Sequence, residues 1–418
     1  MPAKKKAATK KAAPKKTAPK KTTKKKKEKE LSKSDRLAIL QQDINAKFKG
    51  RVAIQTGQEF SNVFILRRPS GITSLDLAIG GGFPAGGMSQ IVGADSVGKD
   101  YIVNRVIAYL QSTYGEEASV ALAMTEMSYD KKYAKLCGVR VALTPEEIEA
   151  WQKALDRPFT NEEMAWAKDQ VGSIYQITAS NAEALLEAAA QCIESNLYHV
   201  VVINSFGALL TKAEEEAEHG LEDKHYSGAA MPITSFMHRL HAALNLPDYE
   251  GKPNKTTVLG INQFRDNVGR DAKYNPLKIA GGWALKHGKL VDIYLAARQR
   301  IKPTINNKQV VVGKEIHWEI LKGKAGCHDG PKGMYPFYFG DHGYPFGADV
   351  YQDLIVTAVQ FGIVQMSGAW LSYEEHGYSI KGQGKEKFAH AVAETDGAFD
   401  HLRSLCFDAA NVNFIVSD

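Results

Sequence analysis

The sequence predicts an α/β fold in which a mainly parallel sheet is flanked by helices. Short apolar, β-rich segments occur at residues 88–93, 119–125, 173–178, 199–205 and 256–262. Helical patterns at 99–115 and 181–195 lie between some of them, and such crossovers are how parallel strands are connected. A glycine-rich loop, GADSVGKD at residues 93–100, joins the first strand to the first of these helices.

Four regions follow from composition and patterning. Residues 1–30 form a Lys-rich tail, and 31–69 begin with a short amphipathic helix that we interpret as an oligomerisation segment. Residues 70–341 form the α/β core, with a polar helical insertion at about 141–171. Antiparallel strands at 290–301 and 308–321 are expected at one sheet edge, and residues 342–418 form a small α/β domain.

The composition fits a globular protein in a reducing compartment. Hydrophobic residues make up 44% of the 418 residues, and no apolar run is long enough to predict a membrane span or a secretory signal. The four cysteines are far apart and match neither a metal site nor a disulfide framework. We therefore expect a cytoplasmic protein.

The positive charge is concentrated in the tail. Residues 1–30 contain 14 Lys and 2 Glu, whereas the whole chain carries only +6, so the remainder is net negative. A segment with no large apolar residue cannot offset its ordering entropy and is predicted to be disordered. Its expected partner is a polyanion such as nucleic acid, bound through salt-sensitive phosphate contacts; a solubilising or nuclear-targeting role is the alternative.

The loop has most of the features of a phosphate-binding loop. Gly93, Gly98 and Lys99 occupy the positions where glycines let backbone N–H groups face phosphates and a lysine neutralises β/γ charge. Its other members and neighbours are candidate nucleotide contacts, namely Asp95, Ser96, Val97, Asp100 and Tyr101. The last loop position departs from the pattern, because Asp100 replaces the Ser or Thr that holds magnesium.

Several blocks resemble the RecA family of DNA-strand-exchange recombinases, in the same order and with similar spacing. They include PSGITSLDLAIGGGFPAGGMSQIVGADSVGKD, TEMSYDKKYAKLCGV, VVINSFGALLTKAE, GINQFRDNVG, GGWALKHGK, EILKGKAG and SGAWLSY. They span roughly residues 34 to 390 and leave the tail and the insertion outside. The resemblance implies a RecA-like P-loop core that binds ATP and Mg²⁺.

The resemblance also implies roles for individual residues. Glu126 matches the catalytic carboxylate that polarises the attacking water, and Gln263 matches the γ-phosphate sensor. Asp130, Tyr133 and Tyr351 match residues that hold adenine. Lys322 and Lys324 match lysines that reach a neighbouring subunit's ATP in a filament; alternating solvent-facing lysines on an edge strand are the alternative interpretation.

Two loops, at about 206–227 and 264–281, are candidates for contact with single-stranded DNA. Cations interleaved with aromatic rings suit backbone contact and base stacking. The candidate residues are Tyr226, Arg265, Gly269, Arg270, Lys273 and Tyr274. The first loop is acidic, and Met231 and His238 stand where the family tends to have Arg, so the tail is expected to compensate for weaker core affinity.

A second departure accompanies Asp100. Asn204, at the end of the fourth strand, replaces the Asp that holds magnesium in the family. Together the two changes move one carboxylate from strand to loop and leave the summed charge around the ion unchanged. The sequence therefore permits a charge-swapped magnesium site, or alternatively a decayed one.

The expected function is that of a DNA-dependent ATPase of bacterial or bacteriophage type. It would form ATP-bound filaments on single-stranded DNA and pair that strand with duplex DNA. A non-hydrolysing DNA-binding filament protein with a degenerate nucleotide site is the main alternative. A hexameric helicase is another, which GGWALKHGK, LKGKAG and the short N-terminal helix disfavour.

Overall fold

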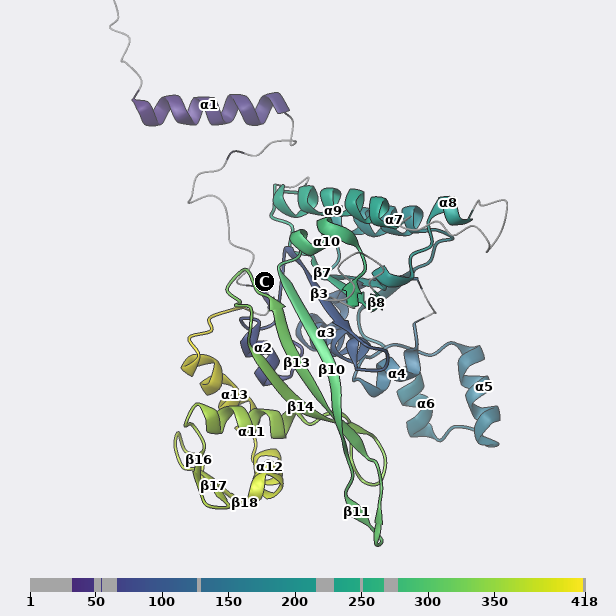
Figure 1. Cartoon of the computed structure of the whole chain (residues 1–418), viewed down its shortest axis with the longest axis vertical. Helices are drawn as coiled ribbons and strands as arrows, with labels where there is room; N and C mark the ends of the chain where they lie inside the picture. The colour runs from purple at the N-terminus through teal and green to yellow at the C-terminus, as the bar shows by residue number, and fades with distance from the viewer. Residues whose placement is uncertain are drawn as a thin grey trace, which may run out of the picture.

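The computed structural model describes residues 32–48, 54, 66–125, 129–215, 229–248, 251–266 and 277–415. Nine strands form the main sheet of this described chain: Gly87–Gly93 (β3), Ser119–Met124 (β4), Ser173–Ile177 (β5), Val200–Asn204 (β6), Thr257–Asn262 (β7), Val291–Ile301 (β10), Gly313–Lys322 (β13), Lys332–Phe339 (β14) and Phe346–Ala348 (β15). Their order across the sheet is β15-β14-β13-β10-β3-β7-β6-β4-β5 (Figure 1).

The sheet is parallel over two thirds of its width. Strands β10, β3, β7, β6, β4 and β5 run parallel to one another, while β13, β14 and β15 add an antiparallel edge next to β10. This confirms the mainly parallel sheet that the sequence predicts. Because parallel strands end at one edge, Gly93, Asn204 and Asn262 terminate near one another, which is where ligands bind in folds of this kind.

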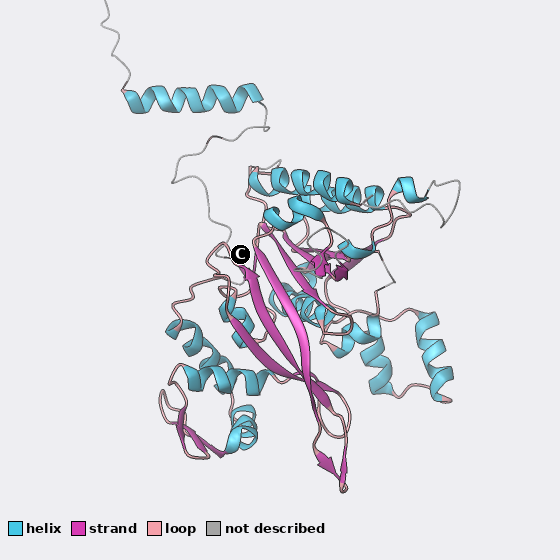
Figure 2. Cartoon of the chain, viewed as in Figure 1, coloured by secondary structure: helices cyan, strands magenta, loops and turns pink. Residues whose placement is uncertain are grey.

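Helices cover both faces of the sheet (Figure 2). The core helices are Thr73–Ala78 (α2), Lys99–Tyr114 (α3), Lys131–Leu136 (α4), Ala182–Glu194 (α7), Lys212–Glu215 (α8), Ala230–Asn245 (α9) and Gly282–Gly288 (α10). Pro145–Leu155 (α5) and Asn161–Lys168 (α6) form the helical insertion. Each of α5 and α6 begins with a Thr–Glu capping box, at Thr144 and Thr160.

Alternating residues of the strands divide the core into two layers. On β4, Val120 and Leu122 belong to the cluster that contains α3, whereas Ala121 and Ala123 belong to the cluster that contains α7 and α9. Side chains alternate between faces along a strand, so a strand with helices on both sides must be apolar at every position. This explains the uninterrupted apolar runs in the sequence.

A smaller unit follows β15. It contains Val350–Gln360 (α11), Gly384–Glu394 (α12) and Ala398–Ala409 (α13), with an antiparallel sheet of Gln365–Ser367 (β16), Trp370–Tyr373 (β17) and Ile380–Gln383 (β18) around its own core. Two buried carboxylates tie it to α2: Ser74 N donates to Asp353 (3.0 Å), and Arg403 pairs with Asp76 (3.1 Å). The predicted boundary at 341/342 falls between β14 and β15, which pair in the main sheet.

The remaining elements lie outside the main sheet and the C-terminal unit. Lys33–Phe48 (α1) has no buried residue, and its Leu37, Leu40 and Phe48 are exposed. Short strand pairs form at Arg67–Arg68 (β1) with Phe83–Pro84 (β2), Phe264–Asp266 (β8) with Leu277–Ile279 (β9), and Thr304–Ile305 (β11) with Lys308–Gln309 (β12). Within the described ranges, no helix is long and apolar enough to cross a membrane.

Candidate nucleotide site

The loop between β3 and α3 adopts a conformation that its glycines make possible. Gly98 caps α3 with φ +98°, and a Cβ on Gly93 would lie 2.6 Å from the carbonyl oxygen of Leu295 on the adjacent strand. The Lys99 ammonium folds back across the loop and donates to the carbonyls of Gly93 (3.0 Å) and Ala94 (2.8 Å). The loop and the start of α3 thus present backbone N–H groups, a helix dipole and a lysine, which suit a phosphate chain.

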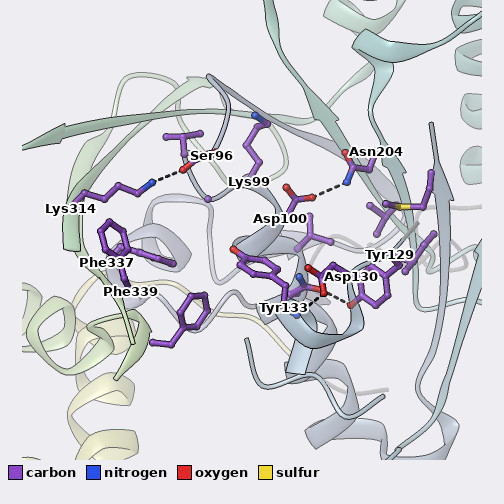
Figure 3. A pocket seen from close by; sticks show the side chains of 18 residues that line it. Ser96, Lys99, Asp100, Tyr129, Asp130, Tyr133, Asn204, Lys314, Phe337 and Phe339 are labelled. Carbon is purple, nitrogen blue, oxygen red and sulfur yellow. Dashed lines mark hydrogen bonds between the residues drawn. The ribbon is translucent and has the colours of Figure 1, made fainter. Parts of the chain in front are cut away.

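A cavity of about 700 Å³ opens beside this loop (Figure 3). It lies between the loop that joins β3 to α3, helix α4 and the antiparallel edge of the sheet. Its lining residues are Ser96, Val97, Gly98, Lys99, Asp100, Val103, Asn104, Leu122, Met124, Tyr129, Asp130, Tyr133, Val202, Asn204, Lys314, Phe337, Phe339 and Phe346. One end is polar and the other aromatic, so the cavity can accept a charged group and a flat ring together.

The two residues that depart from the magnesium pattern contact each other. Asn204 Nδ2, at the end of β6, donates a hydrogen bond of 2.8 Å to Asp100 Oδ1 in the first turn of α3 (Figure 3). Both side chains line the cavity next to Lys99. No group of three or more His, Cys, Asp or Glu residues suited to a metal occurs in the described ranges. Mg²⁺ nevertheless needs only one or two protein oxygens when phosphates and waters complete its shell.

Gln263 lies one residue beyond β7 and reaches the phosphate loop. Its Nε2 donates to Asp95 Oδ1 at 2.9 Å. Directly after it, β8 pairs with β9, so the two ends of the second predicted DNA loop are held together as a short ribbon. The residue predicted to sense phosphate therefore bridges the phosphate loop and the base of that ribbon.

The residues predicted to hold adenine, Asp130 and Tyr133, lie at the N-cap and in the first turn of α4 and line the cavity. Asp130 caps α4 by accepting from Tyr133 N at 2.9 Å, and the Tyr133 ring packs edge-on against Phe346 with a centroid distance of 5.7 Å. The Tyr129 hydroxyl donates to the Asn104 side chain. Burial raises the pKa of Tyr129 and of Tyr133, so both rings stay neutral.

Four lining residues from the antiparallel edge were not predicted from the sequence: Lys314, Phe337, Phe339 and Phe346. Lys314 Nζ donates to the Ser96 carbonyl and lies 5.9 Å from the centroid of the Phe339 ring. Burial lowers the pKa of Lys314. The aromatic density of YPFYFGDHGYPF at 335–346 was the available signal, but periodicity does not reveal that this edge folds towards the loop.

Several predicted contacts lie elsewhere. Tyr101 is buried beneath the cavity, where it packs edge-on against Phe337 at 4.9 Å and its hydroxyl accepts from Ala348 N at 2.9 Å. Tyr351 packs against Phe399 at 4.9 Å in the core of the C-terminal unit. Neither lines the cavity: Tyr101 packs behind Phe337 and Phe346, which do line it, and Tyr351 belongs to α11.

The two lysines predicted to act across a subunit interface are also outside this cavity. Lys322 Nζ donates to the carbonyls of Lys286 (2.9 Å) and His287 (2.8 Å), at the end of α10. Lys324 is exposed. Their action on a neighbouring subunit stays a prediction.

The other predicted residues fall outside what can be described. Glu126, Tyr226, Gly269, Arg270, Lys273 and Tyr274 lie outside the described residues. Arg265 belongs to β8, and only its backbone is described. On α9, Met231 is 79% exposed, so the position where the family tends to have Arg presents an apolar surface instead.

The sheet order and the loop at the end of β3 define an α/β protein of the P-loop class. A family model described as the RecA N-terminal domain matches residues 36–146 and 169–328. The chain therefore belongs to the RecA family.

Two relatives that are 30% identical agree with this assignment. Protein RecA of Thermus aquaticus is 30% identical over 345 residues, which cover 82% of this chain and 85% of that protein. Protein RecA of Francisella tularensis subsp. novicida is 30% identical over 375 residues, covering 89% and 88%. A crystal structure of the RadB recombinase matches 65% of this chain and 96% of its own, with 16% identity and a TM-score of 0.39.

Proposed function

We propose that the chain is an ATP-dependent DNA-strand-exchange protein whose magnesium site is charge-swapped and functional. The observation that carries this proposal is the 2.8 Å hydrogen bond from Asn204 Nδ2 to Asp100 Oδ1. The two substitutions face each other across one site, as a compensating pair would.

The donor set fits Mg²⁺. An amide has a donor and an acceptor, so Asn204 can hold Asp100 through its nitrogen while its oxygen serves a hard cation. Asp100 supplies the one negatively charged oxygen ligand. In the family pattern, that ligand comes from an Asp at the position of Asn204, at the end of β6. The ion would neutralise phosphate charge beside Lys99, whose position on the loop carbonyls supports a phosphate site.

The same cavity accommodates the rest of the nucleotide. Tyr133 and the phenylalanines of the antiparallel edge offer ring faces and edges for a base, and Asp130 offers a carboxylate. Glu126 is proposed as the residue that orients the attacking water. Gln263 is proposed to release its hydrogen bond to Asp95 and to donate to the γ-phosphate instead. This exchange would change the conformation of the predicted DNA loop that follows β8.

DNA is the proposed partner of that loop and of the Lys-rich tail. Filaments on single-stranded DNA, with ATP between subunits and duplex DNA as the second substrate, follow from the family and from the exposed apolar side chains of α1. Lys322 and Lys324 are proposed to act at the subunit interface.

The deciding experiment measures ATP turnover by the full chain with and without single-stranded DNA, in Mg²⁺. We expect hydrolysis that DNA stimulates, and DNA binding that ATP strengthens. DNA binding that ignores ATP, with no hydrolysis in any metal or salt condition, would instead identify a filament protein with a degenerate nucleotide site.

A further inference from the structure

The helical insertion is an addition of this chain to its family's core. The family model matches on either side of residues 147–168 and omits the segment between them. Helices α5 and α6 lie side by side next to α4 (Figure 1) and have a small core of their own. In that core, the Trp151 ring packs edge-on against Phe159 (5.5 Å) and Trp166 (5.4 Å).

Three lysines of α4 contact this insertion. Lys131 pairs with Glu147 at 2.9 Å, and Lys132 Nζ lies 4.1 Å from the centroid of the Trp151 ring. The third, Lys135, is buried; its Nζ lies 4.8 Å from the Trp166 centroid and donates to the carbonyls of Val141 (3.0 Å) and Asp169 (3.2 Å). The cationic side of α4 is therefore held by the insertion along its whole length.

The other side of α4 belongs to the nucleotide site. Ala134 and Cys137 pack into the main core, and Asp130 and Tyr133 line the cavity. With six residues, α4 is too short to be a stable helix by itself, so its position depends on what packs against it. The insertion supplies contacts on the side that the sheet and α3 do not cover.

We propose that the insertion positions α4 for nucleoside recognition, with Trp151 and Lys132 as the positioning residues. It acts on the base and ribose end of the ligand, because α4 contributes Asp130 and Tyr133 there, while the phosphates are held by the loop between β3 and α3. The inference rests on the proposed nucleotide binding at this cavity.

The test separates the two ends of the ligand. Titration calorimetry on the full chain in Mg²⁺ compares ATP with inorganic tripolyphosphate, which has phosphates but no nucleoside. Trp151→Ala and Lys132→Ala should each weaken ATP binding roughly fivefold, as expected for loss of a cation–π contact, and leave tripolyphosphate binding unchanged. Lys132→Arg keeps a cation over the ring and should restore ATP affinity.

Arg157→Ala is the matched control. Its ion pair with Glu163 (2.8 Å) lies in the same insertion but does not contact α4. ATP binding should equal that of the unchanged chain. Equal weakening of both ligands, or no weakening of either, by Lys132→Ala would overturn the inference while leaving nucleotide binding intact. Failure of the unchanged chain to bind either ligand would instead remove the proposed function, and this inference with it.

Discussion

Gln263 Nε2 donates to Asp95 Oδ1 at 2.9 Å and so connects the end of β7 to the phosphate loop. Gln263 is followed at once by β8, which leads into the second predicted DNA loop. A ligand phosphate and the Asp95 carboxylate would compete for the same amide. In the function proposed above, this contact is the arrangement of Gln263 before a phosphate binds.

Replacing Asp95 with Ala should weaken the coupling between ATP and DNA. Without its carboxylate partner, Gln263 is already released before nucleotide binds, so ATP has less to change. We expect the ratio of single-stranded DNA affinities with and without an ATP analogue to shrink roughly three- to tenfold, the scale of one ordinary net hydrogen bond at an exposed site. Fluorescence anisotropy with labelled oligonucleotide measures this ratio. Asp95→Asn retains an acceptor oxygen and should stay closer to the original ratio; an unchanged ratio in Asp95→Ala would argue against competition.

A reciprocal series tests the charge swap. Asn204→Asp places a second carboxylate against Asp100, and Asp100→Thr removes the only carboxylate of the pair, so each should reduce Mg²⁺-dependent ATPase activity about tenfold or more. The double variant restores one carboxylate and one neutral oxygen and should recover most activity. Activity is measured against Mg²⁺ concentration. Additive losses in the double variant would mean that the two positions do not share an ion.

Removal of residues 1–30 should change how DNA binding responds to salt. Each Lys that contacts a phosphate of single-stranded DNA adds about 0.7 to the slope of log affinity against log salt concentration. A chain beginning at Leu31 should therefore show a shallower slope than the full chain, which has 14 Lys in the tail. Identical slopes would assign the tail a role other than DNA contact.

Asp353 should make stability depend on pH. Burial raises its pKa to about 6 in the folded chain, against 3.8 for the ordinary group, although Ser74 hydrogen bonds oppose the shift. The folded state holds more protons between these values, so the free energy of unfolding falls as pH rises from about 4 to 6, by up to about 3 kcal/mol.

The matched variant for this effect is Asp353→Asn, which cannot titrate. The difference in stability between the two proteins should change over pH 4–6 and be flat above about 7, as measured by urea unfolding. A buried carboxyl that does not interact with Asp353, such as Asp292, titrates in both proteins and cancels in this difference. A constant difference across the range would contradict the raised pKa.

The sequence predicted the parallel half of the fold because that half is encoded locally. The strand at 200–204 is apolar from Val200 to Ile203, and α3 follows a glycine-rich loop that can be recognised from Gly98 and Lys99. The helices of the insertion could be predicted for the same reason.

The far side of the cavity could not be predicted in this way. Phe337 and Phe346 reach it only because β14 and β15 extend the sheet antiparallel and fold alongside the loop, which is a tertiary relationship. Tyr351 lies on α11 in the C-terminal core for a similar reason: matching a short motif does not fix which surface a helix presents. The sequence predicted that Asp100 and Asn204 have exchanged the carboxylate and the neutral oxygen of one magnesium site. Only the structure shows that the two side chains form a hydrogen bond.

Strands β14 and β15 have a practical consequence for dissecting the protein. The family match ends at residue 328, yet three of the five aromatic rings that line the cavity lie beyond it, on strands that lead directly into α11. A chain shortened at that point would keep the loop between β3 and α3. It would lose the wall of the cavity that β14 and β15 form. The same strand pair both lines the cavity and leads into the C-terminal unit, so removing that unit at residue 328 also removes part of the cavity wall.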